Sequence, residues 1–162
     1  MGTVCVINRA SSCPVSVETW CEWFKLWLTE MNQEIMAVDH YELSLCLTGD
    51  DEIEQLNFQY RQQKRPTDVL AFAATEVPSP VPTDALYQQE PLYLGDIVIS
   101  LETALRQAQE QNHSLTIELA WLATHGLLHL LGWDHTDAKS LRQMLVQQQK
   151  LLHKVDLFIQ YC

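Results

Sequence analysis

Residues 125–135 read HGLLHLLGWDH, and this stretch constrains the fold more than any other part of the chain. Its leucines predict a helix that packs against a core, with His125 and His129 four residues apart on one face of that helix. Gly132 predicts the end of the helix, because glycine is common just after a helical C-terminus, and it allows the chain to turn back with His135. The fold must therefore bring three imidazoles together at the end of one apolar helix.

The spacing H-x3-H-x2-G-x2-H predicts a metal site. A single histidine is usually a core or surface residue with ordinary partners, but histidines one helical turn apart commonly hold zinc. Three imidazoles leave the fourth tetrahedral position open for water, as in hydrolytic sites, whereas a structural site closes with a fourth Cys or His. We therefore predict one Zn²⁺ ion per chain, held by His125, His129 and His135.

The residue after the first histidine separates two kinds of zinc enzyme. Zinc proteases of this spacing read H-E-x-x-H, and their glutamate is the general base, a contribution of ~10²- to 10⁴-fold. This chain has Gly126 in that position, so a metallopeptidase stays only as an alternative. Asp134 is either a turn residue or a group that orients or joins the ligands. Glu118 shares the helix face with His125, and we expect a structural role for it.

Strand-type and helix-type patterns alternate along the chain. The leucines of YELSLCLTG recur at every second residue, which is typical of a strand with one buried face. The aromatic residues between Trp20 and Met31 recur at helical spacing and predict a core-facing helix opened by Pro14. The predicted strands lie near residues 4–7, 43–48, 69–73 and 94–100, and the predicted helices near residues 14–31, 50–61, 101–112, 115–131 and 137–154. We predict an α/β (α+β) fold, in which a small mixed β-sheet of about four strands packs with about five helices and the metal site lies at the C-terminal end of a central helix.

Some details of these helices can be predicted as well. Asp50 and Asp51 should start the second helix through capping and the helix dipole, and Ser114 or Asn112 should cap the helix that carries the histidines. One face of the second helix is expected to hold Ile53, Leu56, Asn57 and Tyr60, and one face of the third Leu101, Ala104, Leu105 and Ala108. Residues 75–93, which hold four of the six prolines, predict a mobile flap.

The composition narrows the class of protein. A length of 162 residues fits one domain, which we predict for residues 1–162. The net charge of -11 argues against a general nucleic-acid coat protein, so a polyanion would have to meet a local basic patch or a metal. Five cysteines without a C-x-x-C pair indicate reduced thiols and a cytoplasmic protein. The sequence shows neither a signal peptide nor an apolar run long enough for a membrane span.

These motifs together resemble the YbeY family of rRNA maturation factors. The family signature H-G-x-L-H-L-x-G-[YF]-D-H is matched from His125 to His135, with Trp133 in place of the usual Tyr. Two upstream motifs are similar, L-N-x-x-[YF]-R…P-T-D-V-L-S-F and L-G-D-I. They are matched by Leu56, Asn57, Tyr60, Arg61, Arg65, Pro66, Thr67, Asp68, Val69, Leu70 and Phe72, and by Leu94, Gly95, Asp96 and Ile97. Departures are Ala71 in place of Ser, a longer proline-rich insert, and a last helix with few acidic residues.

The resemblance implies a function. It implies a metal-dependent, single-strand-specific endoribonuclease that acts in ribosomal RNA maturation, in 3′-end processing of small-subunit rRNA, and in ribosome quality control. RNA precursors and the ribosome or its proteins would be the partners. It also implies that the three histidines bind zinc and that Arg61 is a functional residue of the same cleft. A noncatalytic ribosome-assembly factor with structural zinc is the alternative from another class.

A guanidinium suits this chemistry, because the transition state of phosphodiester cleavage gains negative charge that Arg61 can bind through two N–H groups. Lys64 and Arg65 are candidate contacts for the flanking phosphates. For both, the alternative is a solvated cationic helix end, which the helix dipole also favours.

Overall fold

The fold is seen in a computed structural model, which describes residues 2–10, 12–35, 41–74 and 92–159. Its described elements are four strands and five helices that alternate in the first half of the chain. In chain order they are β1 (Gly2–Asn8), α1 (Val17–Ile35), β2 (Tyr41–Thr48), α2 (Asp50–Arg61), β3 (Val69–Ala73), β4 (Leu92–Ser100), α4 (Leu101–Gln111), α5 (Leu115–Leu130) and α6 (Ala138–Lys154). The predicted fold class is therefore confirmed.

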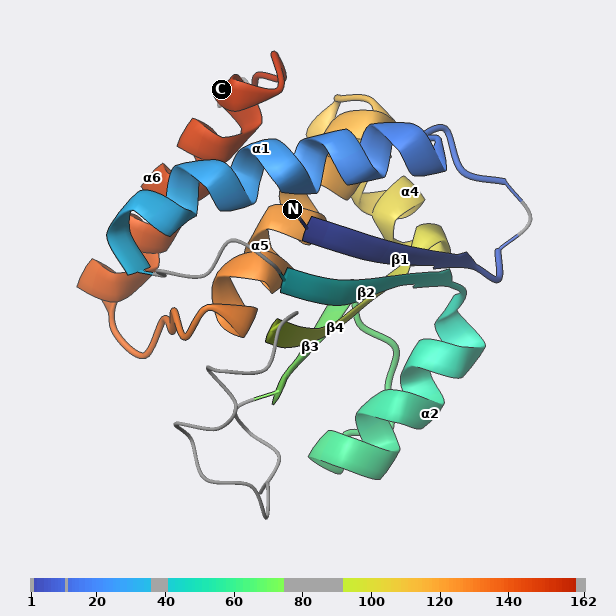
Figure 1. The fold of residues 1–162 in the computed structure, drawn as a ribbon. Helices are drawn as coiled ribbons and strands as arrows, with labels where there is room; N and C mark the ends of the chain where they lie inside the picture. The colour runs from blue at the N-terminus through green and yellow to red at the C-terminus, as the bar shows by residue number, and fades with distance from the viewer. Residues whose placement is uncertain (1, 11, 36–40, 75–91, 160–162) are drawn as a thin grey trace.

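The four strands form one mixed sheet in the order β1-β2-β4-β3. β1, β2 and β4 run parallel, and β3 pairs antiparallel with β4 at one edge. Helices lie on both faces of this sheet, with α1 and α5 on one side and α2 on the other (Figure 1). Alternate strand residues point to the two faces, which is why a period of two in the sequence produces two separate packing layers.

The larger core lies between the sheet and the helices α1, α5 and α6. Leu45 and Leu47 of β2 are buried there, as their alternation predicted, and Trp27 of α1 is fully buried as well. The indole Nε1 of Trp27 donates a hydrogen bond of 2.8 Å to the carbonyl oxygen of Leu151 in α6. The aromatic stripe of α1 is therefore core, as predicted, and it also joins the first helix to the last.

A smaller core lies on the other face of the sheet. Ile53 of α2 is buried against Leu70 of β3 and Val98 of β4. This small contact area leaves part of α2 exposed, so Tyr60, predicted on its inner face, is 59% exposed. Leu105 of α4 is likewise 45% exposed, against the prediction, because α4 buries a narrower stripe of Leu101, Ala104 and Ala108.

The start of α1 and the cap of α2 differ from the prediction, whereas α2 begins at Asp50 as predicted. α1 begins at Val17 because the Ser16 hydroxyl accepts a hydrogen bond from the Thr19 N–H at 3.1 Å, so Pro14 lies outside the helix. Gly49 is the N-cap of α2 and makes no side-chain cap. Asp50 instead accepts hydrogen bonds of 2.6 Å from the hydroxyls of Ser100 and Thr103, which joins the starts of α2 and α4. A tertiary contact thus takes the carboxylate that the sequence assigns to a local cap.

β4 begins at Leu92, so the predicted flap is wrong at its last two residues, and residues 75–91 lie outside the described part of the chain.

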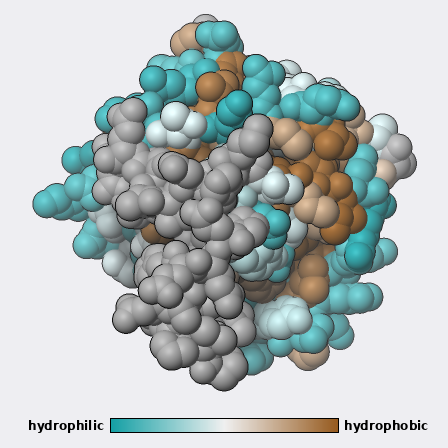
Figure 2. Space-filling view, in the orientation of Figure 1, coloured by the Kyte–Doolittle hydropathy of each residue, from teal (hydrophilic) through white to brown (hydrophobic). Residues whose placement is uncertain are grey.

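Figure 2 shows apolar surface on the right of the same view, in the region of β1 in Figure 1, where Ile7 is 39% exposed. Among the described helices, none combines the length and apolarity needed to cross a bilayer.

The structure requires a glycine at position 95, in the L-G-D-I motif. The pairing of β2 with β4 shifts register between Glu42 and Leu43, and Gly95 follows this irregularity with a φ of +138°. A Cβ atom at position 95 would collide with the carbonyl oxygen of Phe72 in β3. Backbone cannot move aside as a side chain can, so only glycine fits here.

Candidate metal centre

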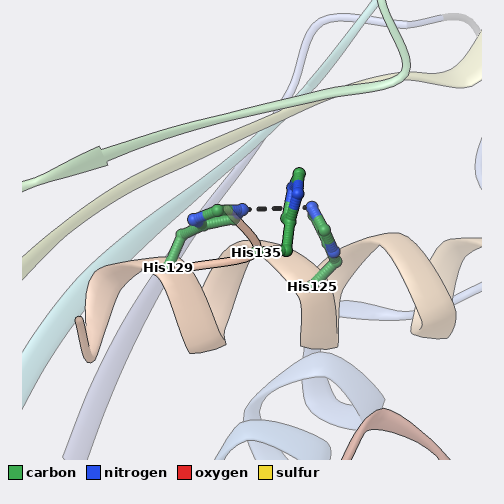
Figure 3. A group of neighbouring side chains, drawn as sticks. All are labelled: His125, His129 and His135. Atoms are coloured by element: carbon green, nitrogen blue, oxygen red, sulfur yellow. Dashed lines mark hydrogen bonds between the residues drawn. The ribbon is translucent and has the colours of Figure 1, made fainter. Parts of the chain in front are cut away.

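Helix α5 positions the first two histidines. The Ser114 hydroxyl caps the helix by accepting the Ile117 N–H at 3.1 Å, as predicted, while Asn112 ends α4 in the left-handed conformation. His125 and His129 emerge one turn apart near the C-terminal end of α5 (Figure 3). Their Nε2 atoms lie 3.2 Å apart, so the two rings point at one place.

A turn after α5 brings in the third histidine. The helix ends at Leu130, and Gly132 adopts a φ of +95° with no atom near its absent side chain, so its role is conformational. The Trp133 N–H donates to the Leu128 carbonyl at 2.9 Å, and the Asp134 carboxylate accepts the His135 N–H at 2.7 Å. The contact of the Asp134 carboxylate with the His135 backbone is the contact expected of a turn residue.

The three imidazoles form a compact donor set. The ring centroid of His135 lies 5.7 Å from that of His125 and 5.5 Å from that of His129. One ligand atom from each of the three residues lies within 4.8 Å of the others. Nitrogens at these separations can reach a common ion with small side-chain movements, since Zn–N bonds are ~2.0–2.1 Å long. The structure therefore brings together the three residues that the spacing selected.

The electrostatics of the site favour the neutral form of His125 and His129. Burial, followed by charge repulsion from the neighbouring His125 and His135, lowers the pKa of His129 to about 4. Burial also lowers the pKa of His125, against an opposing hydrogen bond from Gln148. A neutral imidazole has the free lone pair that a metal requires. The donor set thus fits a transition-metal ion by chemistry as well as by distance.

The histidines open onto a pocket of about 880 Å³. Arg61 from the end of α2 lines it, together with Arg65 and Asp68 from the turn that leads into β3. Lys64 lies elsewhere, in a smaller hollow of about 300 Å³ beside α2. The chain thus brings Arg61 and Arg65 to the histidine pocket and leaves Lys64 outside its lining.

Arg61 is held by two contacts with β3. Its Nη2 donates a hydrogen bond of 3.0 Å to the Ala71 carbonyl, and its Cζ lies 5.8 Å from the centre of the Phe72 ring. The charge of Arg61 also contributes to the low pKa of His129, after burial and the two histidines. A guanidinium fixed in this way is already placed for an anion beside the imidazoles.

Asp68, from the upstream P-T-D motif, lines the pocket as well, which its place in the sequence does not predict. Its Oδ1 accepts the Val69 N–H at 2.7 Å, and its Oδ2 accepts from Gln107 at 3.3 Å. Its negative charge opposes the burial that lowers the pKa of His125. The signal in the sequence was a carboxylate between a basic turn and a strand, and only the fold shows that it lines the histidine pocket.

Gly126, the residue that departs from the protease motif, packs against the sheet. A Cβ atom at this position would lie 2.8 Å from Cγ2 of Ile97, a buried residue of β4. A glutamate side chain would therefore need the helix to move away from the sheet. This close packing gives a physical reason why the general base of the H-E-x-x-H enzymes is absent, and it argues against a metallopeptidase.

Comparisons with known proteins agree with this site. The family described as Endoribonuclease YbeY matches residues 6–156. Proteins named Endoribonuclease YbeY from Cyanothece sp. and Nostoc sp. are 56% and 54% identical, over 93% and 90% of this chain and 88% and 78% of their own lengths. The solution structure of TM1509 from Thermotoga maritima superposes with a TM-score of 0.59 at 27% identity, over 94% of this chain and 88% of that one. The chain belongs to the YbeY family of endoribonucleases.

Proposed function

We propose that this protein is a zinc-dependent endoribonuclease that cleaves single-stranded RNA at the pocket shared by Arg61 and the three histidines. One observation carries the proposal. Three convergent imidazoles lie in the same pocket as a guanidinium fixed against β3, in a chain whose curated relatives are named endoribonucleases. A metal and a fixed cation are the two groups that a phosphodiester needs most, since its charge grows in the transition state.

The donor set supports zinc as the ion. Imidazole suits zinc, copper, iron and nickel, whereas magnesium and calcium prefer oxygen ligands. His125, His129 and His135 would hold the ion with one coordination position free, and the bound ion would supply Lewis-acid chemistry to the phosphate or to water. Zinc is the choice among these metals because three histidines and an open position are the common form of its catalytic sites.

Arg61 binds the non-bridging oxygens of the scissile phosphate through the N–H groups that do not contact Ala71. Arg65 lines the same pocket and contacts a flanking phosphate, whereas Lys64 lies in a separate hollow and is assigned no phosphate contact. Asp68 lines the pocket and supplies a carboxylate that can accept a proton. Position 126 has no room for a glutamate in this role, because a Cβ atom there would collide with Ile97.

The substrate that we propose is precursor ribosomal RNA, cleaved in the 3′-end maturation of the small subunit and in ribosome quality control, with the ribosome or its proteins as partners. The family membership supports RNA as the substrate. A net charge of -11 on the chain repels RNA outside the pocket and makes binding selective and salt-sensitive. We place the protein in the cytoplasm, in keeping with free thiols at Cys5, Cys13, Cys21 and Cys46. Residues 1–162 would act as one domain.

The test combines metal analysis with RNA cleavage. Purified wild type should carry about one zinc ion per chain and cut single-stranded RNA faster than structured RNA. His129→Ala should lose both the metal and the cleavage, whereas Arg61→Ala should keep the metal and lose cleavage by ~10²- to 10³-fold. Equal cutting by all three proteins would identify a contaminating nuclease and end the proposal. Zinc-dependent hydrolysis of peptides, lost in His129→Ala, would favour the metallopeptidase instead.

A further inference from the structure

Two aromatic side chains of α2 lie open to solvent, and the second directly precedes the pocket residue Arg61 in the chain. Tyr60 is 59% exposed and Phe58 is 55% exposed. Residues two apart on a helix do not share a face, so the two rings look in different directions. Single exposed aromatics are ordinary, and their neighbours decide whether a ring has a partner to bind.

Tyr60 is fixed beside the group that would bind phosphate. Its ring centre lies 5.2 Å from that of Phe72 in a T-shaped contact at 62°. The guanidinium of Arg61 lies 5.8 Å from the centre of the same Phe72 ring. Phe72 is thus a common support that holds an exposed aromatic ring and a cation next to each other, with the cation on the side of the pocket.

We propose that Tyr60 is a stacking platform for one unpaired nucleobase of the RNA strand whose phosphate binds Arg61. This rests on the proposed function, since it needs RNA in the pocket. A nucleotide carries its base one sugar away from its phosphate, so adjacent sites for an aromatic ring and an anion match a single residue of RNA. Exposed aromatic rings beside a cationic groove are the usual means by which proteins bind single strands.

The platform supplies a reason for strand selectivity. In a duplex the faces of each base are covered by its neighbours in the stack, and sequence-specific proteins therefore bind bases that are splayed out of single strands. A ring at Tyr60 has a free face only for such a base. Stacking is tolerant of sequence because every base has a π-face, so we expect selectivity for single strands with weak preference among the four bases.

Phe58 provides the matched contrast. It is as exposed as Tyr60, but it lines a hollow with two carboxylates, Asp51 and Glu54, and one cation, Lys64. The carboxylates repel a phosphate backbone. Phe58 is therefore an exposed aromatic on the same helix without a place for RNA beside it, and we assign it no part in substrate binding.

The experiment measures cleavage of a short unpaired RNA by wild type, Tyr60→Ala, Tyr60→Phe and Phe58→Ala. Tyr60→Ala should raise KM by ~5- to 100-fold, the range expected for one lost stacking contact. Tyr60→Phe keeps the ring and Phe58→Ala lies off the path, so both should stay within about twofold of wild type. The preference for unpaired over paired RNA should fall in Tyr60→Ala alone. Thermal melting of each variant checks that it is folded.

A second substrate series locates the base. Oligonucleotides with one abasic position are cleaved by wild type, and one position near the cut should reproduce the KM of Tyr60→Ala. That abasic substrate should show no further loss with Tyr60→Ala itself, because the contact is already gone. An unchanged KM in folded Tyr60→Ala, or an equal loss in Phe58→Ala, overturns the platform.

Binding separates this inference from the proposed function. The anisotropy of a labelled unpaired octanucleotide is measured with each protein. If wild type binds the octanucleotide more tightly than Tyr60→Ala does but cuts no RNA, the nuclease proposal fails and the platform stands. If wild type cuts RNA and Tyr60→Ala matches it in KM and binding, the platform fails and the nuclease stands. Failure of wild type both to bind and to cut overturns both.

Discussion

Helix α5 carries a buried polar side chain at its first end and half-buried ones at its second, and the contacts of these side chains differ. At the start of the helix, Glu118 is 5% exposed and its Oε2 lies 2.7 Å from Nε2 of His113. At the other end, His125 and His129 have mainly each other and a 3.5 Å contact with Gln148. The first pair satisfies itself within the protein, whereas the second set has lone pairs that point at a common place.

Burial acts on both ends, and the neighbours decide the outcome. Burial raises the pKa of Glu118, and the hydrogen bond and charge of His113 oppose that rise. Burial lowers the pKa of His129, and its neighbouring histidines lower it further. A buried polar group that is paired with a group of opposite charge stabilises the fold. Several groups of the same kind held close together indicate a binding site for a ligand such as a metal ion. This comparison separates a structural polar pair from a candidate site.

The largest expected effect comes from the C-terminal end. His125→Ala should abolish stoichiometric metal binding and lower RNA cleavage by ~10³-fold, about 4 kcal/mol of lost transition-state stabilisation. Metal content by elemental analysis and initial rates on unpaired RNA measure the change. The comparison breaks if His125→Ala keeps a full complement of metal.

The N-terminal end should respond in stability and not in metal. Glu118→Ala leaves the half-buried His113 ring without its partner and empties the buried site of the carboxylate, so the free energy of unfolding should fall by about 2–3 kcal/mol. Urea unfolding measures this loss, and metal content and kcat should stay at the wild-type level. A loss of metal in Glu118→Ala would mean that the two ends are not independent.

The metal-free protein should become less stable as the pH falls from about 6.5 to about 4. Folded His129 has a pKa near 4 against 6.5 for an ordinary histidine, so the unfolded chain binds the proton first. The sign is therefore a loss on acidification, on the order of 2 kcal/mol after allowance for solvent screening. Unfolding curves of chelator-treated protein at several pH values measure it. His129→Gln should reduce the dependence in this window, and the part that remains belongs to His125, whose pKa burial also lowers. Phe58→Ala removes no titratable group and should leave the dependence in place.

The smallest expected effect lies in the turn. Gly132→Ala meets no neighbouring atom, so only the strain of its positive φ remains, about 1–2 kcal/mol. Stability should fall by this amount, and zinc affinity should weaken because His135 follows the turn. A zinc titration monitored by competition with a chromophoric chelator measures the affinity. An unchanged affinity would show that His135 holds its position without the turn.

Prediction from the sequence succeeded where the pattern was local and failed where a distant element intervened. The strand at Tyr41–Thr48, the cap at Ser114 and the convergence of the three histidines all follow from spacing along the chain. Asp50 was assigned to a helix cap, but hydroxyls of α4 take its carboxylate. Tyr60 was placed inward by periodicity, yet α2 meets too little of the sheet to cover it.

The sequence by itself determined the chemistry of the site, because residue types four and six positions apart around a helix end leave few other arrangements for His125, His129 and His135. Only the tertiary structure decided what stands beside them. Arg61 and Asp68 reach the pocket because α2 and β3 pack there, and Gly126 is bare because Ile97 occupies the space. Contacts between segments distant in the chain depend on which faces pack together, and no spacing within one segment contains that information.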